Sequence, residues 1–191
     1  MIKTFTGPMH SGKTKAMIEV YRGIYNKEHV KCFKPNKDNR DYGVIKSKDF
    51  DEEIPAICID KFEDILKYVD DTISTIFIDE IQMLEGNVSV LSYLSIVKDM
   101  DIYVAGLNMT SEQDPFLVMP YVLAISDEVD IIKASCYDCG RGATYTYYDG
   151  EKTEAILVGD SNYLPLCPRC IMKRRGQKDM QYLLKKKDTR E

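Results

Sequence analysis

Residues Gly7-Pro8-Met9-His10-Ser11-Gly12-Lys13-Thr14 fit the pattern G-x-x-x-x-G-K-[ST] at every fixed position. The two glycines permit a sharp turn whose backbone N–H groups point at a phosphate, while the lysine and threonine supply a cation and a magnesium-binding hydroxyl. Met1 to Thr6 before the turn indicates a strand, and Lys13 to Tyr25 after it indicates a helix. A ligand-free strand–turn–helix is the alternative. In this context the sequence predicts a nucleoside triphosphate site at a helix N-terminus.

A second acidic motif follows an apolar run. Ser74-Thr75-Ile76-Phe77-Ile78 is typical of a strand buried on both faces, and it ends in Asp79-Glu80. Ligands of open α/β sheets bind at the carboxyl ends of the strands, where Asp79 lies. We therefore expect Asp79 and Thr14 to hold Mg²⁺. Glu80 could then accept a proton from a substrate hydroxyl, as in a kinase, or from water, as in an ATPase. The alternative is an acidic turn that precedes a helix.

Composition sets the broad class of the protein. The chain has 191 residues, of which 44% are apolar and 30% charged, as in an ordinary soluble globule. No leader precedes the phosphate-binding turn and no 18-residue apolar run occurs, so we expect a cytoplasmic protein without a membrane partner. Residues 171–191 carry eight Lys/Arg against three Asp/Glu, but the acidic remainder of the chain would repel a polyanion. We therefore expect no nucleic acid partner.

Four of the six cysteines form two C-x₂-C pairs, Cys136/Cys139 and Cys167/Cys170. Two such knuckles complete a tetrahedral Cys₄ site, and with every position filled by sulfur the predicted zinc is structural. Two disulfides or a redox pair are the alternatives, which a cytosolic protein disfavours. Cys32 and Cys58 lie in apolar surroundings and are expected to be inert buried thiols.

The remaining pattern alternates strands and helices, as in a parallel sheet with helices on both faces. The predicted fold is therefore an α/β, RecA-like P-loop domain over residues 1–135. Residues 136–191 are predicted to form a small zinc-ribbon-like lobe with a basic C-terminal helix. The segments behind this prediction are strands at 29–33, 54–59, 102–105 and 129–134, helices at 61–69, 88–97 and 117–125, and a loop at 106–116.

In this order and spacing, the motifs resemble the type II thymidine kinases, the small cytosolic class, over essentially the whole chain. The resemblance rests on the phosphate-binding turn, the two cysteine pairs and four further stretches. These are Lys37-Asp38-Asn39-Arg40, Asp79-Glu80-Ile81-Gln82, Pro115-Phe116-Leu117-Val118-Met119-Pro120 and Gly159-Asp160-Ser161-Asn162-Tyr163. It implies transfer of the ATP γ-phosphoryl to the 5′-hydroxyl of thymidine, giving dTMP for nucleotide salvage and DNA synthesis. It also implies a lasso-like substrate loop carried by the C-terminal lobe, a homotetramer and dTTP as a possible feedback inhibitor.

The resemblance also implies a role for each matching residue. Glu80 would be the proton acceptor, with Arg40 and Lys13 stabilising the phosphoryl group as it transfers. The nucleotide and its Mg²⁺ would be bound by Gly7, Pro8, Met9, His10, Ser11, Gly12, Lys13, Thr14, Asp38, Asn39, Arg40, Asp79 and Gln82. The nucleoside would be bound by Met9, Ser111, Phe116, Thr146, Glu154, Ala155, Ile156, Leu157, Val158, Gly159 and Tyr163. Taken alone, Tyr163 would be a packing residue, Arg40 a solvated charge and Met9 a core residue.

The chain departs from the family pattern mainly in the loop that covers the base. Asn108 stands where an aspartate is expected, Ser111 where an aromatic is expected, and Glu112 where an arginine is common. Met83-Leu84 and His10 also replace aromatics. A modified pyrimidine is therefore an alternative acceptor. A zinc-containing ATPase stimulated by nucleic acid and an ATP-binding regulator without catalysis are the alternative functions.

Overall fold

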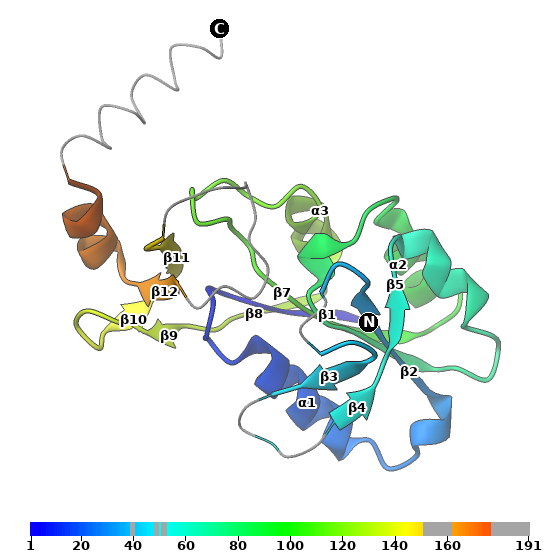
Figure 1. Ribbon diagram of the computed structural model, residues 1–191. Coiled ribbons are helices and arrows are strands. Elements are labelled where there is room, and N and C mark those ends of the chain that lie inside the picture. Colours follow the sequence, from blue (N-terminus) through cyan, green and yellow to red (C-terminus); the bar gives the residue numbers. More distant parts are fainter. Residues whose placement is uncertain (39–40, 48–49, 51–52, 151–161, 177–191) are drawn as a thin grey trace, which may run out of the picture.

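The computed structural model describes residues 1–38, 41–47, 50, 53–150 and 162–176 of the chain. Its centre is a six-stranded sheet in the order β5-β2-β6-β7-β1-β8, in which every pair of neighbours is parallel (Figure 1). The strands are β1 (Ile2–Thr6), β2 (Val30–Pro35), β5 (Ile57–Ile59), β6 (Thr75–Ile78), β7 (Asp101–Gly106) and β8 (Glu128–Ile131). The predicted parallel sheet is confirmed.

Helical segments cover both faces of this sheet. They are α1 (Lys13–Gly23), α2 (Ser89–Ile96), α3 (Met119–Ile125) and the short 3₁₀ segments η1 (Lys27–His29), η2 (Phe62–Lys67) and η3 (Ile81–Met83). Alternate residues of β6 are buried on opposite faces of the sheet. Ile76 and Ile78 belong to the core cluster beneath α2 and α3, and Phe77 belongs to the cluster beneath α1. A strand buried on both faces explains the unbroken apolar run in the sequence. The register aligns the C-terminal end of β6 with those of β2 and β7.

Three predicted elements differ from the structure. The predicted strand at 129–134 ends at Ile131, and Ala134–Ser135 form a separate short strand that pairs outside the central sheet. The predicted strand at 54–59 is two strands: β4 (Glu53–Pro55), which pairs with β3 (Val44–Lys46), and β5 at the sheet edge. The two strands have different partners, because β5 pairs with β2, and Pro55, the last residue of β4, has no N–H to continue a ladder. The predicted helix at 61–69 is the six-residue 3₁₀ segment η2.

The C-terminal region folds beside the phosphate-binding end of the sheet. Its strands are β9 (Ala134–Ser135), β10 (Gly142–Ala143), β11 (Tyr145–Tyr148) and β12 (Tyr163–Leu166), paired as β9–β10 and β11–β12 (Figure 1). A third core cluster holds this region together, and three of the four paired cysteines belong to it. Residues 168–176 are helical. Within the described ranges, no helix combines the length and apolar character that a bilayer crossing requires.

Candidate active site

The phosphate-binding turn joins β1 to α1, as the sequence predicts. Gly7 has a φ of 150°, and a Cβ at this position would lie 2.1 Å from the carbonyl oxygen of Ile132. Gly12 caps α1 in the left-handed conformation, with a φ of 86°. Only glycine satisfies the first position and glycine is strongly favoured at the second, so the motif residues are required by the backbone of the turn. The turn therefore places the N-terminal N–H groups of α1 where they can bind a phosphate.

The lysine and threonine of the motif contact different parts of the molecule. Lys13 is buried, and its Nζ donates to the Pro8 carbonyl oxygen at 2.7 Å. The Thr14 hydroxyl donates to both carboxylate oxygens of Asp79, at 3.1 and 3.2 Å. The structure thus joins the two motifs that the sequence identified separately. A hydroxyl and a carboxylate are the oxygen ligands that Mg²⁺ prefers, so this donor set fits that ion.

Asp79 is a buried carboxyl at the end of β6. Burial, and then the charge of the adjacent Glu80, raise the pKa of Asp79 from 3.8 to about 7. Between about pH 4 and pH 7 the folded protein therefore holds a proton that the unfolded chain has released, so its stability falls as the pH rises through this range. A bound cation would offset the cost of the ionised carboxylate.

Asp79→Asn should accordingly raise the free energy of unfolding of the ligand-free protein at pH 8 by about 1–3 kcal/mol. At pH 4, where Asp79 is protonated, the gain should largely disappear. Urea unfolding at both pH values measures the effect, with the exposed Asp60→Asn as a control expected to change stability by less than about 0.5 kcal/mol. A loss of stability at pH 8 would mean that the Asp79 carboxylate stabilises the fold.

Glu80 occupies a strained position between β6 and η3. Its φ of 50° and ψ of 36° lie in the left-handed region, which a residue with a Cβ rarely adopts and which clusters at functional sites. The Gln82 side chain donates to Glu80 Oε2 at 2.6 Å and accepts from the Leu107 backbone N–H at 3.0 Å. A Cβ on Gly106 would lie 2.7 Å from Gln82 Oε1, so this approach requires glycine. Gln82, expected to bind nucleotide, lies here against the carboxylate.

The loop after β2 contains a buried ion pair that the sequence reasoning missed. Lys34 is 2% exposed, and its Nζ lies 3.2 Å from Asp38 Oδ2. The same ammonium group donates to the carbonyl oxygens of Asp41 and Val44, at 2.5 and 3.1 Å. The pair fixes the chain on both sides of the predicted nucleotide-binding residues Asn39 and Arg40, which lie outside the described residues. Its signal in the sequence is a lysine inside an apolar strand followed four residues later by an aspartate.

The structure brings together two of the residues expected at the nucleoside. The Met9 backbone N–H donates to the Thr146 hydroxyl at 3.0 Å, so β11 of the C-terminal lobe contacts the phosphate-binding turn directly. Tyr163 packs its ring on Tyr148, with the ring centroids 4.9 Å apart. Ser111 is buried. The expected base-binding residues Glu154, Ala155, Ile156, Leu157, Val158 and Gly159 lie outside the described part of the chain.

A cavity of about 860 Å³ opens beside Gln82, between η3 and residues 110–121. Two predicted site residues, Gln82 and Phe116, line it, as does Met83, which stands where the resemblance places an aromatic. The remaining described lining residues are Lys37, Leu84, Glu85, Gly86, Val88, Thr110, Pro115, Leu117, Val118 and Tyr121. The volume and the largely apolar lining are typical of a small-molecule site.

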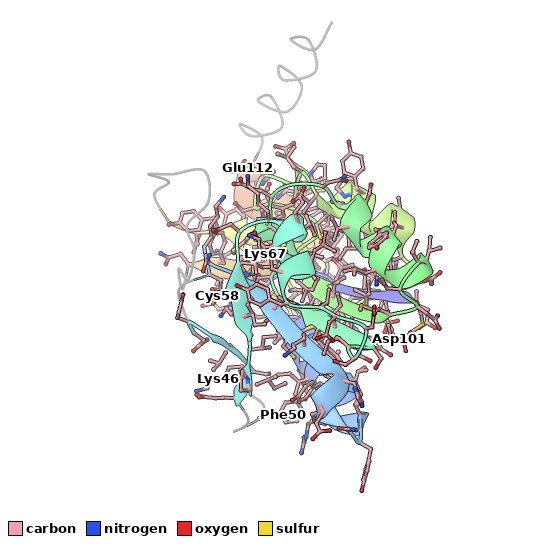
Figure 2. The ribbon with its side chains drawn as sticks, turned by 90° about the vertical axis from the view of Figure 1, so that its right-hand side faces the viewer. Lys46, Phe50, Cys58, Lys67, Asp101 and Glu112 are labelled. Carbon is pink, nitrogen blue, oxygen red and sulfur yellow. The ribbon has the colours of Figure 1, made fainter. Side chains whose placement is uncertain are left out.

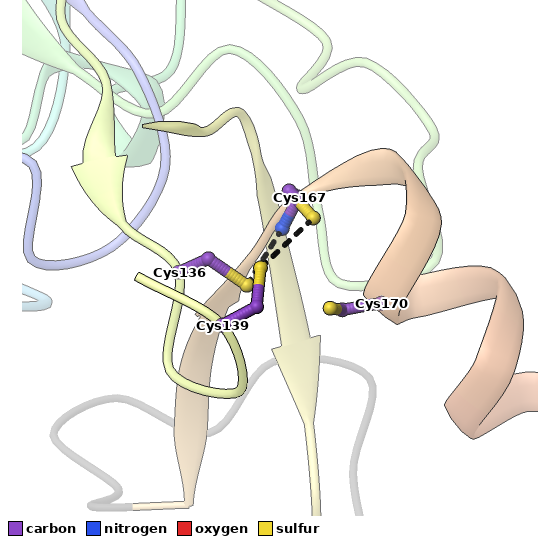
Figure 3. Close-up of side chains that lie close together, drawn as sticks. All are labelled: Cys136, Cys139, Cys167 and Cys170. Carbon is purple, nitrogen blue, oxygen red and sulfur yellow. Dashed lines mark hydrogen bonds between the residues drawn. The ribbon is translucent and has the colours of Figure 1, made fainter. Parts of the chain in front are cut away.

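The four paired cysteines converge, as the spacing predicts. All four sulfurs lie within 4.8 Å of one another, and Cys139 Sγ lies 3.7 Å from Cys167 Sγ (Figure 3). A tetrahedron of Zn–S bonds places its sulfurs about 3.8 Å apart, whereas a disulfide needs about 2 Å. The cluster is therefore compatible with zinc, and all four cysteines are free thiols in the structure rather than disulfide-bonded. With four sulfurs as ligands, such a site has no open position for water.

Basic and N–H groups surround the sulfurs. The Arg141 Nε lies 3.4 Å from Cys139 Sγ and lowers the pKa of that thiol to about 6. The Cys167 backbone N–H donates to Cys136 Sγ at 3.3 Å. The Arg141 contact favours the thiolate form of Cys139, the form that binds metal. Of the two other cysteines, Cys32 is buried as expected, but Cys58 is only half-buried because β5 is the edge strand of the sheet (Figure 2).

Comparison with known proteins agrees with this geometry. Residues 1–171 match the thymidine kinase family. The chain belongs to the thymidine kinase family. It is 33% identical over 179 residues to the thymidine kinase of Pseudothermotoga lettingae, which covers 91% of this chain and 95% of the relative. It is 34% identical to the thymidine kinase of Onion yellows phytoplasma, over 88% of this chain and 84% of that protein. For the Bacteroides thetaiotaomicron thymidine kinase the identity is 31%, over 92% and 89%.

Family membership confirms the resemblance drawn from the motifs and makes this protein a kinase. A kinase of this family uses ATP, and the glycine-dependent turn at Gly7–Thr14 has a backbone that fits a phosphate. The cysteine cluster is compatible with the predicted zinc.

Proposed function

We propose that this thymidine kinase transfers the γ-phosphoryl group of ATP to the 5′-hydroxyl of thymidine, giving dTMP for nucleotide salvage. The observation that carries the proposal is the placement of Glu80. Its carboxylate lies next in the chain to Asp79, which contacts Thr14 of the phosphate-binding turn, and Gln82 holds it by a hydrogen bond. A proton acceptor held beside a triphosphate cradle suits transfer to a substrate hydroxyl.

In the proposed reaction, the Glu80 carboxylate takes the proton of the 5′-hydroxyl as that oxygen attacks the γ-phosphorus. The new O5′–P bond forms, the bond between the γ-phosphorus and the β,γ-bridging oxygen breaks, and ADP leaves with the electron pair of that bond. Lys13 would exchange the Pro8 carbonyl oxygen for the phosphate oxygens when ATP binds, and would neutralise charge on them during the transfer. Arg40 is proposed to supply a second cation, from the loop that the Lys34–Asp38 pair holds.

Two metals complete the proposal. Thr14 and Asp79 would hold Mg²⁺, which when bound neutralises negative charge on the β- and γ-phosphates. Cys136, Cys139, Cys167 and Cys170 would hold a structural Zn²⁺, which fixes the lobe that carries Thr146 and Tyr163. The stretch at 154–159 is proposed to present backbone groups to the edge of the base, and Met9, Ser111 and Phe116 to bound the pocket.

The resemblance to the type II thymidine kinases also concerns assembly, location and regulation. We propose a homotetramer located in the cytoplasm, with dTTP as feedback inhibitor. Met83 lines the cavity where the family pattern has an aromatic, and Ser111 replaces another. Because losing a stacked aromatic costs about 1–3 kcal/mol per base, a pyrimidine modified at the ring could compete with thymidine as acceptor.

Incubation with Mg-ATP labelled at the γ-phosphoryl and a panel of nucleosides tests the proposal. Labelled monophosphate should form with thymidine or a modified pyrimidine deoxynucleoside and not with purine nucleosides. Release of inorganic phosphate that responds only to DNA or RNA would instead support the nucleic-acid-stimulated ATPase. Binding of ATP without either reaction would support a regulator that has lost catalysis.

A further inference from the structure

The segment between β7 and α3 is an ordered loop, which we call the cover loop and define as residues 107–116. Its two arms approach each other: Met109 bridges to Pro115, and the Phe116 N–H donates to the Asn108 carbonyl oxygen at 3.3 Å. The Thr110 N–H donates to the Asp114 carbonyl oxygen at 2.8 Å. The loop is therefore a pinned hairpin with its tip at residues 111–113.

A side chain from the C-terminal lobe holds this tip. The Arg175 Nη2 donates to the Ser111 carbonyl oxygen at 2.7 Å, and the Arg175 side chain is 15% exposed. Gln113 donates to the same carbonyl oxygen at 2.6 Å. The Glu112 carboxylate lies 3.9 Å from Arg175 and adds a weaker attraction (Figure 2 shows Glu112 at this end of the molecule). A charge-assisted hydrogen bond to a buried residue is among the stronger single contacts available to a loop.

The helix that carries Arg175 is itself fixed to the zinc lobe. It begins directly after Cys167, and Cys170 and Ile171 are buried in the core of the lobe. The neighbouring Arg174 donates to both carboxylate oxygens of Asp138, at 2.9 and 2.7 Å. The Arg174 guanidinium also lies 3.1 Å from Asp149 Oδ2 and 5.7 Å from two tyrosine rings. Arg175 therefore projects from a rigid support.

The opposite end of the cover loop contacts the reaction centre. The Leu107 N–H donates to Gln82 Oε1, and Gln82 Nε2 donates to Glu80 Oε2, at 3.0 and 2.6 Å. Phe116, at the other base of the loop, lines the cavity beside Gln82. A continuous set of hydrogen bonds thus runs from Glu80 to the first residue of the loop, and Arg175 supports the tip of the same loop from the zinc lobe.

We propose that Arg175 is a positioning residue that holds the cover loop in its nucleoside-binding conformation, which couples the metal-bound lobe to acceptor affinity. The inference rests on the proposed function. Ser111 has no aromatic ring to lie on a base, so the loop depends on its anchor at this position. Without the anchor, part of the binding energy of the nucleoside must order the loop, which weakens nucleoside binding and leaves ATP binding nearly unchanged.

Steady-state kinetics of Arg175→Met, which keeps the side-chain stem and removes the guanidinium, test the proposal. The thymidine KM should rise roughly 10-fold to 100-fold, while the ATP KM and kcat stay within about threefold. Lys173→Met, an exposed position on the same helix, is the matched control and should match the wild type. Arg175→Lys should recover part of the loss because it restores a donor. A thymidine KM that does not change, or one that rises together with the ATP KM, would overturn the proposal.

Hydrogen exchange gives a readout that does not depend on the reaction. Amides of residues 107–116 should exchange faster in Arg175→Met than in the wild type, while the zinc content of the variant stays at one per chain. If exchange in the cover loop is unchanged, Arg175 does not hold it and the inference fails. If the wild type phosphorylates no nucleoside, the proposed function fails, and the exchange result still decides whether Arg175 holds the loop.

Discussion

Glu80→Gln should lower kcat for thymidine phosphorylation by roughly 10²–10⁴-fold, the range expected when a general base is removed. Glutamine keeps the length and the Cβ of the side chain, so the left-handed backbone at this position carries the same strain in both proteins. Its amide can still pair with Gln82, but it cannot accept the proton of a 5′-hydroxyl. The loss should therefore lie in the chemical step, with substrate binding largely retained.

Single-turnover measurement of dTMP formation checks this expectation, together with titration of ATP binding. The ATP dissociation constant should change by less than about threefold, because Lys13 and the glycine turn are intact. Glu19→Gln, an exposed position on α1, is the control and should leave kcat unchanged. If kcat in Glu80→Gln equals that of the wild type, Glu80 is not the proton acceptor.

Cys167→Ser is expected to release the zinc and unfold the lobe around it. Cys167 contributes its thiol to the cluster, and a serine hydroxyl is a much poorer zinc ligand than a thiolate, so the substitution weakens metal binding and with it the local fold. Structural zinc is worth about 10–16 kcal/mol in small zinc domains, which far exceeds what this lobe's few buried side chains can replace. Because Thr146 and Arg175 belong to this lobe, thymidine phosphorylation should fall by at least about tenfold.

Atomic emission of purified protein, alongside the thymidine assay, measures both effects. Cys58→Ser provides the matched control, since this half-buried thiol on β5 lies outside the cluster and the variant should keep one zinc per chain. Full zinc content and full activity in Cys167→Ser would remove the Cys₄ site from the account.

Much of the fold follows from local sequence. The glycine spacing of Gly7–Thr14, the apolar run before Asp79 and the cysteine spacing each predict a short structure that depends on few distant contacts. The strand predicted at 54–59 is wrong in detail because its two halves pair with different strands, β4 with β3 and β5 with β2. A hydrophobic pattern along one segment does not reveal such a change of pairing partner.

The candidate site is predictable only where its residues lie within the motifs. Thr14 and Asp79 meet, with Glu80 next in the chain, because both motifs lie at the same sheet edge, which the βαβ pattern implies. Lys34 and Arg175 were not predicted. Lys34 gains its role from burial against a loop, and Arg175 from a contact with Ser111, 64 residues earlier in the chain. Contacts of that kind depend on how the lobes pack.

The central claim is direct phosphoryl transfer from ATP to the 5′-oxygen of thymidine. The most direct test uses ATP labelled with heavy oxygen at the three non-bridging positions of its γ-phosphoryl group, and mass spectrometry of the products. The account predicts dTMP that contains all three of those heavy oxygens, in an amount equal to the ADP formed. Heavy inorganic phosphate accompanied by unlabelled thymidine would show that water is the acceptor and would contradict the account.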